Sequence, residues 1–189
     1  MMTASGDLCK ILLTEEQLAA RVRELGAKIT EDYRGKLDGK PLLVVGMLKG
    51  SFIFMSDLVR NIDLHCEIDF MSASSYGNST HSSGYVTIKQ DVKDIRDQHV
   101  LIVEDIVDSG FTMKNVLALL KGRNPASLAL CSLLDKPSRR DPSAGDIRVD
   151  YLGFSIEDEF VVGYGLDYAS RYRNLPYIGV LKQEMYANN

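Results

Sequence analysis

The first long stretch of the chain carries apolar residues at intervals of three or four positions, with charged and polar residues between them. This spacing places the apolar side chains on one face of a helix. The residues on that face are Leu18, Val22, Leu25, Ile29 and Tyr33. Thr14-Glu15-Glu16-Gln17 precedes them and can form a capping box, which satisfies free N–H groups at a helix start. The pattern predicts an amphipathic helix from about Glu15 to Tyr33, with its apolar face in the core.

After this helix the apolar residues gather into runs of strand length. Leu42–Met47 is continuously apolar, as is typical of a strand buried on both faces, and a helical stretch ending near Arg60 follows it. Further strands are expected at Cys66–Met71, around Val86 and Ile88, at Val100–Val103, at Ser127–Leu134 and at Tyr177–Leu181. Strands that alternate with helices predict a largely parallel α/β sheet.

Two polar stretches interrupt this alternation. Ser72 to Gly84 has little to bury and is expected to form a loop. A second loop, rich in Pro, Ser, Arg and Asp, follows Lys136-Pro137. The next apolar runs, Tyr151–Phe154 and Phe160–Val162, are short enough to form a cap over the sheet.

Length and composition fit one domain with a substantial core. The chain has 189 residues, of which 45% are hydrophobic, and its formal net charge is -4. This charge gives no general electrostatic reason to bind nucleic acid or an anionic membrane. Cys9, Cys66 and Cys131 form no C-x-x-C pair and are expected to be buried thiols in a reducing compartment. Without a leader-like start or a membrane-length apolar run, the protein is expected to be cytosolic.

The segment from Val100 to Met113 has the features of a site for a phosphorylated sugar. An apolar strand runs into Glu104 and Asp105, and a turn at Ser109-Gly110 then opens a helix. Free N–H groups and the positive dipole end at a helix start attract phosphate. The two carboxylates would repel that phosphate, so they must point elsewhere, where they suit sugar hydroxyls or hydrated Mg²⁺.

An acidic pair at a strand end also occurs in phosphoacceptor receiver domains, whose active-site lysine is often followed by proline, as in Lys136-Pro137. A receiver carries that pair on its first strand, whereas Glu104-Asp105 lies past mid-chain. The order of the motifs therefore disfavours this class. The patterns G-x-x-x-x-G-K-[ST] and G-x-G-x-x-G are absent, which argues against P-loop and dinucleotide sites.

The same segment resembles the phosphoribosyl pyrophosphate (PRPP) signature of type I phosphoribosyltransferases. That signature is an apolar strand, two acidic residues, two apolar residues, Asp, Ser or Thr, Gly, any residue and Thr. Further segments resemble the hypoxanthine-guanine branch of the family: Leu48-Lys49-Gly50-Ser51, Ser74-Ser75-Tyr76-Gly77, Leu133-Leu134-Asp135-Lys136 and Phe160 to Tyr168. The resemblance covers nearly all of Thr14 to Leu181.

The fold that this resemblance implies is a mainly parallel twisted sheet flanked by helices, forming a single domain over residues 1–189. A small hood would be built from the N-terminal segment and about 137–175. A flexible lid loop would lie at about 74–90. The family forms dimers and tetramers, so a homo-oligomer is expected.

By the same resemblance the signature holds both ends of a phosphoribosyl group. The residues around the 5′-phosphate would be Asp108, Ser109, Gly110, Phe111 and Thr112. Phe111 departs from the basic or polar residue often found in this loop, although backbone donors tolerate variation there. Glu104 and Asp105 would bind the ribose hydroxyls and through them Mg²⁺, with Asp167 as the second metal contact. Asp108 would also be the base near purine N7.

Other positions would complete the site. Pyrophosphate would be bound by Leu48, Lys49, Gly50 and Arg173, with a cis peptide between the first two. Ser75 and Tyr76 would belong to the lid. The purine would be bound by Lys136, Phe160, Val161 and Asp167. An ammonium at Lys136 donates to a 6-oxo group but matches a 6-amino group poorly.

The implied activity is Mg²⁺-dependent transfer of ribose 5-phosphate from PRPP to a 6-oxopurine, in purine salvage. Hypoxanthine, guanine and xanthine stay open as acceptors, because all three share the O6 that Lys136 would read. An alternative is an RNA-binding regulator built on the same fold. The acidic balance, Lys136 and Phe160-Val161 weigh against that alternative.

Overall fold

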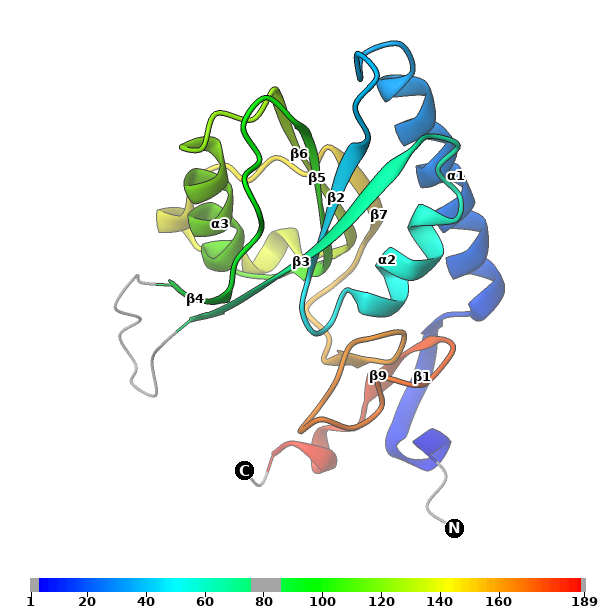
Figure 1. Cartoon of the computed structure of the whole chain (residues 1–189). Helices are drawn as coiled ribbons and strands as arrows, with labels where there is room; N and C mark the ends of the chain where they lie inside the picture. The colour runs from blue at the N-terminus through cyan, green and yellow to red at the C-terminus, as the bar shows by residue number, and fades with distance from the viewer. Residues whose placement is uncertain (1–3, 76–85, 188–189) are drawn as a thin grey trace.

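Six strands form the main sheet of the computed structural model, which describes residues 4–75 and 86–187 (Figure 1). Their spatial order is β4 (Val86–Gln90), β3 (Cys66–Ser75), β2 (Leu42–Met47), β5 (His99–Val107), β6 (Ser127–Asp135) and β7 (Tyr151–Ser155). β2 pairs in parallel with β3 and β5, and β6 pairs in parallel with β5 and β7. β4 runs antiparallel to β3. The largely parallel sheet expected from the sequence is confirmed.

Helices cover both faces of this sheet (Figure 1). They are α1 (Glu15–Tyr33) and α2 (Phe52–Val59) on one face and α3 (Phe111–Lys121) on the other. Along β2, Leu42 and Val44 enter the core under α1 and α2, whereas Leu43 and Val45 enter the core under α3. This burial on two sides is why the strand reads as a continuous apolar run.

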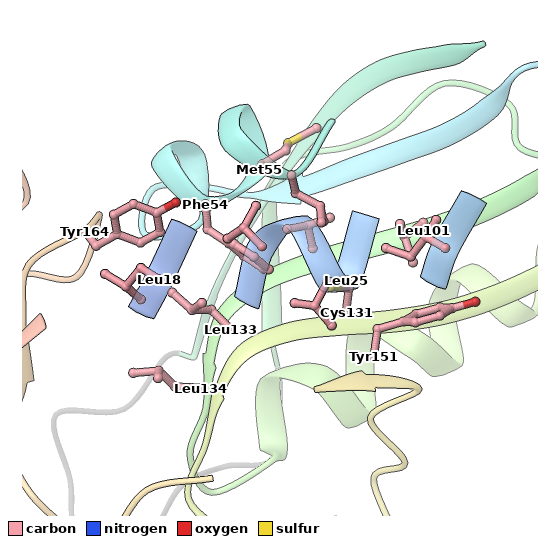
Figure 2. Packing of buried hydrophobic residues seen from close by; sticks show 14 of the residues in the cluster. Leu18, Leu25, Phe54, Met55, Leu101, Cys131, Leu133, Leu134, Tyr151 and Tyr164 are labelled. Carbon is pink, nitrogen blue, oxygen red and sulfur yellow. The ribbon is translucent and has the colours of Figure 1, made fainter. Parts of the chain in front are cut away.

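Figure 2 shows the core between α1, α2 and the sheet. Leu18 and Leu25 of α1 and Phe54 of α2 pack in one buried cluster with Leu101 and Leu133 of the strands. Each such side chain contributes roughly 1.5–3 kcal/mol when it is fully buried. The apolar stripe read from the sequence is thus part of the core, as expected.

The N-terminus of α1 has the capping box that the sequence predicted. The N–H group of Gln17 donates to Thr14 Oγ1 at 3.3 Å, and the Thr14 N–H donates to Gln17 Oε1 at 2.9 Å. The capping box is therefore formed, and the helix limits at Glu15 and Tyr33 are confirmed.

A second, smaller sheet consists of β1 (Leu8–Leu13), β9 (Ile178–Leu181) and β8 (Val161–Val162), in that order and antiparallel. It lies beyond the carboxyl ends of the parallel strands (Figure 1). Short 3-10 helices occur at Ala4–Asp7, Pro137–Arg139, Pro142–Ala144 and Gln183–Met185. The two ends of the chain thus meet in one sheet, which stands over the edge where a ligand of the main sheet would bind.

Three expectations from the sequence were wrong in detail. Tyr151–Ser155, expected in the cap, is the edge strand of the main sheet, because it pairs with β6. β3 continues to Ser75, since β4 pairs with residues that were assigned to a loop. Cys9 is exposed on β1, whereas Cys66 is partly buried and Cys131 is buried.

Within the described ranges, none of the helices combines the length and the apolar character that crossing a bilayer requires.

Candidate active site

The carboxyl ends of β2, β5 and β6 meet at one edge of the main sheet, and each strand leads into a segment that the sequence singles out. Lys49 and Gly50 follow β2, the loop Asp108–Gly110 follows β5, and Lys136 follows β6 directly. Ligands of open α/β sheets bind at such an edge. The parallel topology therefore brings together segments that are distant in sequence.

The loop between β5 and α3 has the geometry of an anion site. Gly110 has a φ of 87°, which glycine adopts without strain, and it begins α3 without a side-chain cap. The first N–H groups of a helix have no partner within the helix, so they can donate to a ligand. A cavity of about 90 Å³ opens here, and its lining includes Ser109, Gly110 and Thr112. These features suit a phosphate group.

Glu104 and Asp105 lie near the end of β5, beside this loop. Oε2 of Glu104 is fully buried and has no hydrogen-bond partner among the described residues. Burial raises the pKa of Glu104 well above its usual range, and the neighbouring Asp105 carboxylate raises it further. Burial also raises the pKa of Asp105 to about 6, although the Ile106 N–H donates to Asp105 Oδ1 at 3.0 Å. Burial thus disfavours the charged forms of both carboxyls, and a bound cation would offset that cost.

We expect Glu104→Gln to raise the Tm at pH 7.5 by about 2–8 °C, the shift that a stabilisation of 1–2 kcal/mol gives in a chain of this size. A folded-state pKa above the unfolded value favours folding while the carboxyl is protonated, and that advantage is lost as pH rises. For Asp105 this stabilisation is lost as the pH rises from 3.8, its ordinary pKa, to about 6, its pKa in the folded protein. At pH 7.5 the wild type therefore carries the cost of the charged, buried Asp105, and Glu104 adds to it because burial and the neighbouring Asp105 raise its pKa as well. The neutral glutamine side chain of the variant removes part of that cost and can still donate to Asp105.

Calorimetry at pH 4.5 and 7.5 tests this expectation, and the gap between variant and wild type should narrow at the lower pH. Glu184→Gln, at an exposed position near the C-terminus, is the matched control and should leave Tm unchanged. A Glu104→Gln variant with a Tm equal to or below that of the wild type at pH 7.5 contradicts the account.

The turn after β2 lies directly against the acidic pair. A Cβ atom at Gly50 would overlap the Asp105 carboxylate, and a Cβ atom at Gly165 would overlap the Gly50 carbonyl oxygen. Gly165 requires glycine because the two backbones approach too closely there and its φ is 104°, whereas Gly50 leaves the space that the Asp105 carboxylate occupies. The Leu48–Lys49 peptide is cis, as the resemblance implied. The Lys49 side chain is exposed at this edge.

Asp167 and Arg173 form an ion pair on the far side of the same turn. Arg173 Nη2 lies 2.7 Å from Asp167 Oδ1, and Arg173 Nη1 donates to the Gly165 carbonyl at 2.6 Å. The Ser170 N–H donates to Asp167 Oδ2 at 2.8 Å. A carboxylate has about four lone-pair sites, so Asp167 keeps acceptor capacity toward the cavity that it lines.

A second cavity, of about 510 Å³, lies beside the loop after β5 and is large enough for a small organic ligand. Its lining includes Ile106, Lys136, Arg139, Phe160, Val161 and Leu166. Lys136 is only 7% exposed, and its Nζ lies 3.7 Å from Asp158 Oδ1 without a hydrogen bond to any described residue. A buried ammonium with unused donors is suited to an acceptor on a ligand.

Asp108 lines both cavities. Arg139 Nε donates to Asp108 Oδ1 at 3.2 Å, and Arg140 Nη1 donates to the Asp108 carbonyl at 2.6 Å. Arg140 also pairs with Asp135 and so ties the loop to the end of β6. One carboxylate therefore lies between a loop suited to phosphate and a larger cavity that contains a buried lysine.

Comparison with known proteins agrees with this geometry. Residues 10–169 match the family model described as phosphoribosyl transferase domain. Hypoxanthine-guanine phosphoribosyltransferases from Streptococcus pneumoniae and Staphylococcus aureus are each 52% identical over 183 residues, which cover 96% of this chain and 98% of each relative. The chain belongs to the hypoxanthine-guanine phosphoribosyltransferase family. A crystal structure of a hypoxanthine phosphoribosyltransferase from Staphylococcus aureus matches it with a TM-score of 0.90 and 51% identity, over 100% of both chains.

Several residues of the larger cavity in this phosphoribosyltransferase were not singled out from the sequence. They are Ile106, Arg139, Asp158, Leu166 and Tyr186. Ile106 lies inside the signature and Leu166 lies inside the Phe160 to Tyr168 segment, so both could have been named by position. Arg139, Asp158 and Tyr186 lie in polar or terminal segments, where no local pattern marks a site residue.

The remaining predicted residues concern the lid. Ser75 is the last residue of β3. Tyr76, together with the rest of 76–85, lies outside the described residues. The lid role of Ser75 and Tyr76 therefore stays a prediction.

Proposed function

We propose that this phosphoribosyltransferase acts in purine salvage. It transfers ribose 5-phosphate from PRPP to hypoxanthine or guanine and releases pyrophosphate, giving IMP or GMP. The observation that carries the proposal is the position of Asp108, which lines both the phosphate cavity and the cavity that contains Lys136. The 52% identity to hypoxanthine-guanine phosphoribosyltransferases supports the same activity.

The phosphoribosyl group spans the loop after β5. Backbone N–H groups at the start of α3 and the hydroxyls of Ser109 and Thr112 donate to its 5′-phosphate. Phe111, the first residue of α3, contributes through its backbone. Glu104 and Asp105 accept hydrogen bonds from the ribose hydroxyls.

Pyrophosphate binds on the other side of the acidic pair. Leu48, Lys49 and Gly50 face it with backbone groups and the Lys49 ammonium, and Arg173 adds a second positive charge. The close approach of Gly50 to Asp105 supports this placement, because it brings the pyrophosphate segment beside the ribose carboxylates.

Glu104, Asp105 and Asp167 fit a magnesium ion, since carboxylate oxygens are its usual protein ligands and Oε2 of Glu104 lacks a partner in the described chain. When bound, Mg²⁺ offsets the negative charge that develops on the leaving pyrophosphate. The residues that the structure describes contain no group of three His, Cys, Asp or Glu side chains arranged to hold a metal by themselves. Glu104, Asp105 and Asp167 would therefore hold Mg²⁺ only together with oxygens supplied by PRPP or water.

The purine occupies the larger cavity. Lys136 Nζ donates to O6, Phe160 provides an aromatic face for stacking, and the Val161 carbonyl meets the purine edge. Asp108 lies near N7 and takes or shares a proton as N9 bonds to C1′. Arg139, which holds the Asp108 carboxylate at 3.2 Å, must release it or share it when the base arrives.

We also infer a homodimer or homotetramer in the cytoplasm that binds PRPP and a purine base and has no nucleic-acid or membrane partner. The three free cysteines support the cytoplasmic location, and the net charge of -4 supports the lack of a nucleic-acid or membrane partner.

One assay tests the proposed function. The protein is incubated with PRPP and Mg²⁺ and, in parallel, with hypoxanthine, guanine, xanthine, adenine, uracil or orotate, while nucleotide and pyrophosphate are measured. Turnover of hypoxanthine and guanine is expected, and chelation of Mg²⁺ should abolish it. Turnover of adenine or a pyrimidine alone would overturn the assignment of the base cavity.

A further inference from the structure

Three aromatic rings gather at the mouth of the purine cavity. The rings of Phe160 and Tyr186 are stacked, with centroids 4.8 Å apart and planes at 23°. Tyr168 meets both rings edge-on, at 5.5 Å from Phe160 and 6.4 Å from Tyr186. Phe160 and Tyr186 both line the cavity, and Phe160 is 37% exposed. One face of Phe160 is therefore covered by a tyrosine that lies close to the end of the chain.

The C-terminal segment reaches this place through ordered backbone contacts. The Leu181 N–H donates to the Phe160 carbonyl at 2.8 Å, which fixes the end of β9 beside Phe160. The Lys182 N–H then donates to the Asp7 carbonyl at 2.9 Å, and the Tyr186 N–H donates to the Gln183 carbonyl at 3.1 Å. The segment after β9 is thus hydrogen-bonded beside both outer strands of the small sheet, and it places Tyr186 against Phe160.

We propose that Tyr186 is a positioning residue for the purine: it holds one face of the Phe160 ring so that the opposite face is presented to the base. This inference rests on the proposed function and adds Tyr186 to the residues that form the purine site. Tyr186 acts through Phe160 and requires no contact of its own with the base.

The physical reason lies in the freedom of a half-exposed phenyl ring. A ring that can adopt several orientations must give up that freedom when a base stacks on it, and this ordering weakens binding. The stacked Tyr186 ring restrains the Phe160 ring before the base binds, and edge-on contacts from Tyr168 restrain both of these rings. Tyr186 should therefore strengthen binding of the purine. It should not affect binding of PRPP, which binds at the loop after β5.

The opposite interpretation is that Tyr186 occupies the place of the purine and must leave when the base binds. The two interpretations predict opposite changes in purine affinity when the Tyr186 ring is removed. Removal of a positioning ring weakens purine binding, whereas removal of a competing ring strengthens it. The KM for the base distinguishes them.

The experiment compares steady-state kinetics of the full-length wild type, Tyr186→Ala, Tyr186→Phe and Tyr186→Leu. We expect Tyr186→Ala to raise the KM for hypoxanthine and guanine by roughly 3- to 10-fold, the range that one aromatic pair supplies. The KM for PRPP should stay within about twofold. Tyr186→Phe keeps the ring and should restore the wild-type KM, whereas Tyr186→Leu keeps bulk without an aromatic face and should not.

Met185→Ala is the matched control, because Met185 packs against the small sheet from the same turn but does not line the cavity. If it raises the purine KM as much as Tyr186→Ala does, anchoring of the segment explains the effect and the positioning role is wrong. Unchanged or lowered purine KM in Tyr186→Ala also overturns the inference. An inactive wild type would instead refute the proposed function, so the two failures are distinct.

Discussion

Replacement of Asp108 by asparagine is expected to lower kcat with hypoxanthine by on the order of 100-fold, the lower end of what general acid–base catalysis contributes. Asparagine has nearly the same shape as aspartate but cannot take a proton. The backbone N–H groups of the phosphate loop are untouched, so the KM for PRPP should change by less than about threefold. Steady-state kinetics with each substrate varied in turn measure both effects.

The geometry explains why this side chain should dominate the chemistry. Asp108 lines both cavities, and Arg139 donates to its carboxylate at 3.2 Å. Asp158→Asn is a matched control, because Asp158 lines the same purine cavity and lies 3.7 Å from Arg139. It should lower kcat much less. Wild-type kcat in Asp108→Asn, with the fold intact, would exclude the role as base.

The second large effect is expected at Lys136. Lys136→Met keeps most of the buried volume but removes the donor to O6, and it should lower kcat/KM for hypoxanthine by about 10- to 100-fold, the value of one hydrogen bond from a charged group. Adenine has no O6, so any residual turnover of adenine should not fall. The ratio of hypoxanthine to adenine turnover is the quantity to measure.

The variant should still fold, because the ammonium of Lys136 has a carboxylate at 3.7 Å as its only ion pair in the described chain and a methionine suits the same buried space. Lys121→Met, at an exposed position on α3, controls for loss of a positive charge. If hypoxanthine and adenine turnover change in parallel, Lys136 does not read O6.

Secondary structure was predicted best where local chemistry decides it. The capping box at Thr14 and the apolar stripe of α1 depend on residues within a few positions of one another, and the helix limits agree with both. β2 was likewise evident, because burial on both faces requires an unbroken apolar run.

The secondary-structure predictions were wrong where pairing between distant strands decides the structure. Tyr151–Ser155 is too short for its periodicity to distinguish a cap from an edge strand, and only pairing with β6 places it in the main sheet. The end of β3 has a polar sequence, but β4 extends it through backbone hydrogen bonds that are indifferent to side chains. Cys9 was expected to be buried because the three cysteines form no C-x-x-C pair, but β1 is exposed on both faces from Cys9 to Ile11.

The sequence by itself determined the phosphoribosyl half of the site. The acidic pair, Asp108 and the glycine turn are contiguous, so their relative positions follow from one strand, one turn and one helix start, which local residues specify. Read alone, that segment predicts a site for a sugar phosphate.

Only the tertiary structure decided the other half. Lys136, Phe160 and Tyr186 come from the end of β6, the start of β8 and the C-terminal turn, and they meet because parallel strands end at one edge and β8 pairs with β9. Strand order and long-range pairing have no local signature, since they are set by the packing of the whole core. For that reason the Asp108–Arg139 contact and the tyrosine behind Phe160 became visible in the folded chain and in no segment of its sequence.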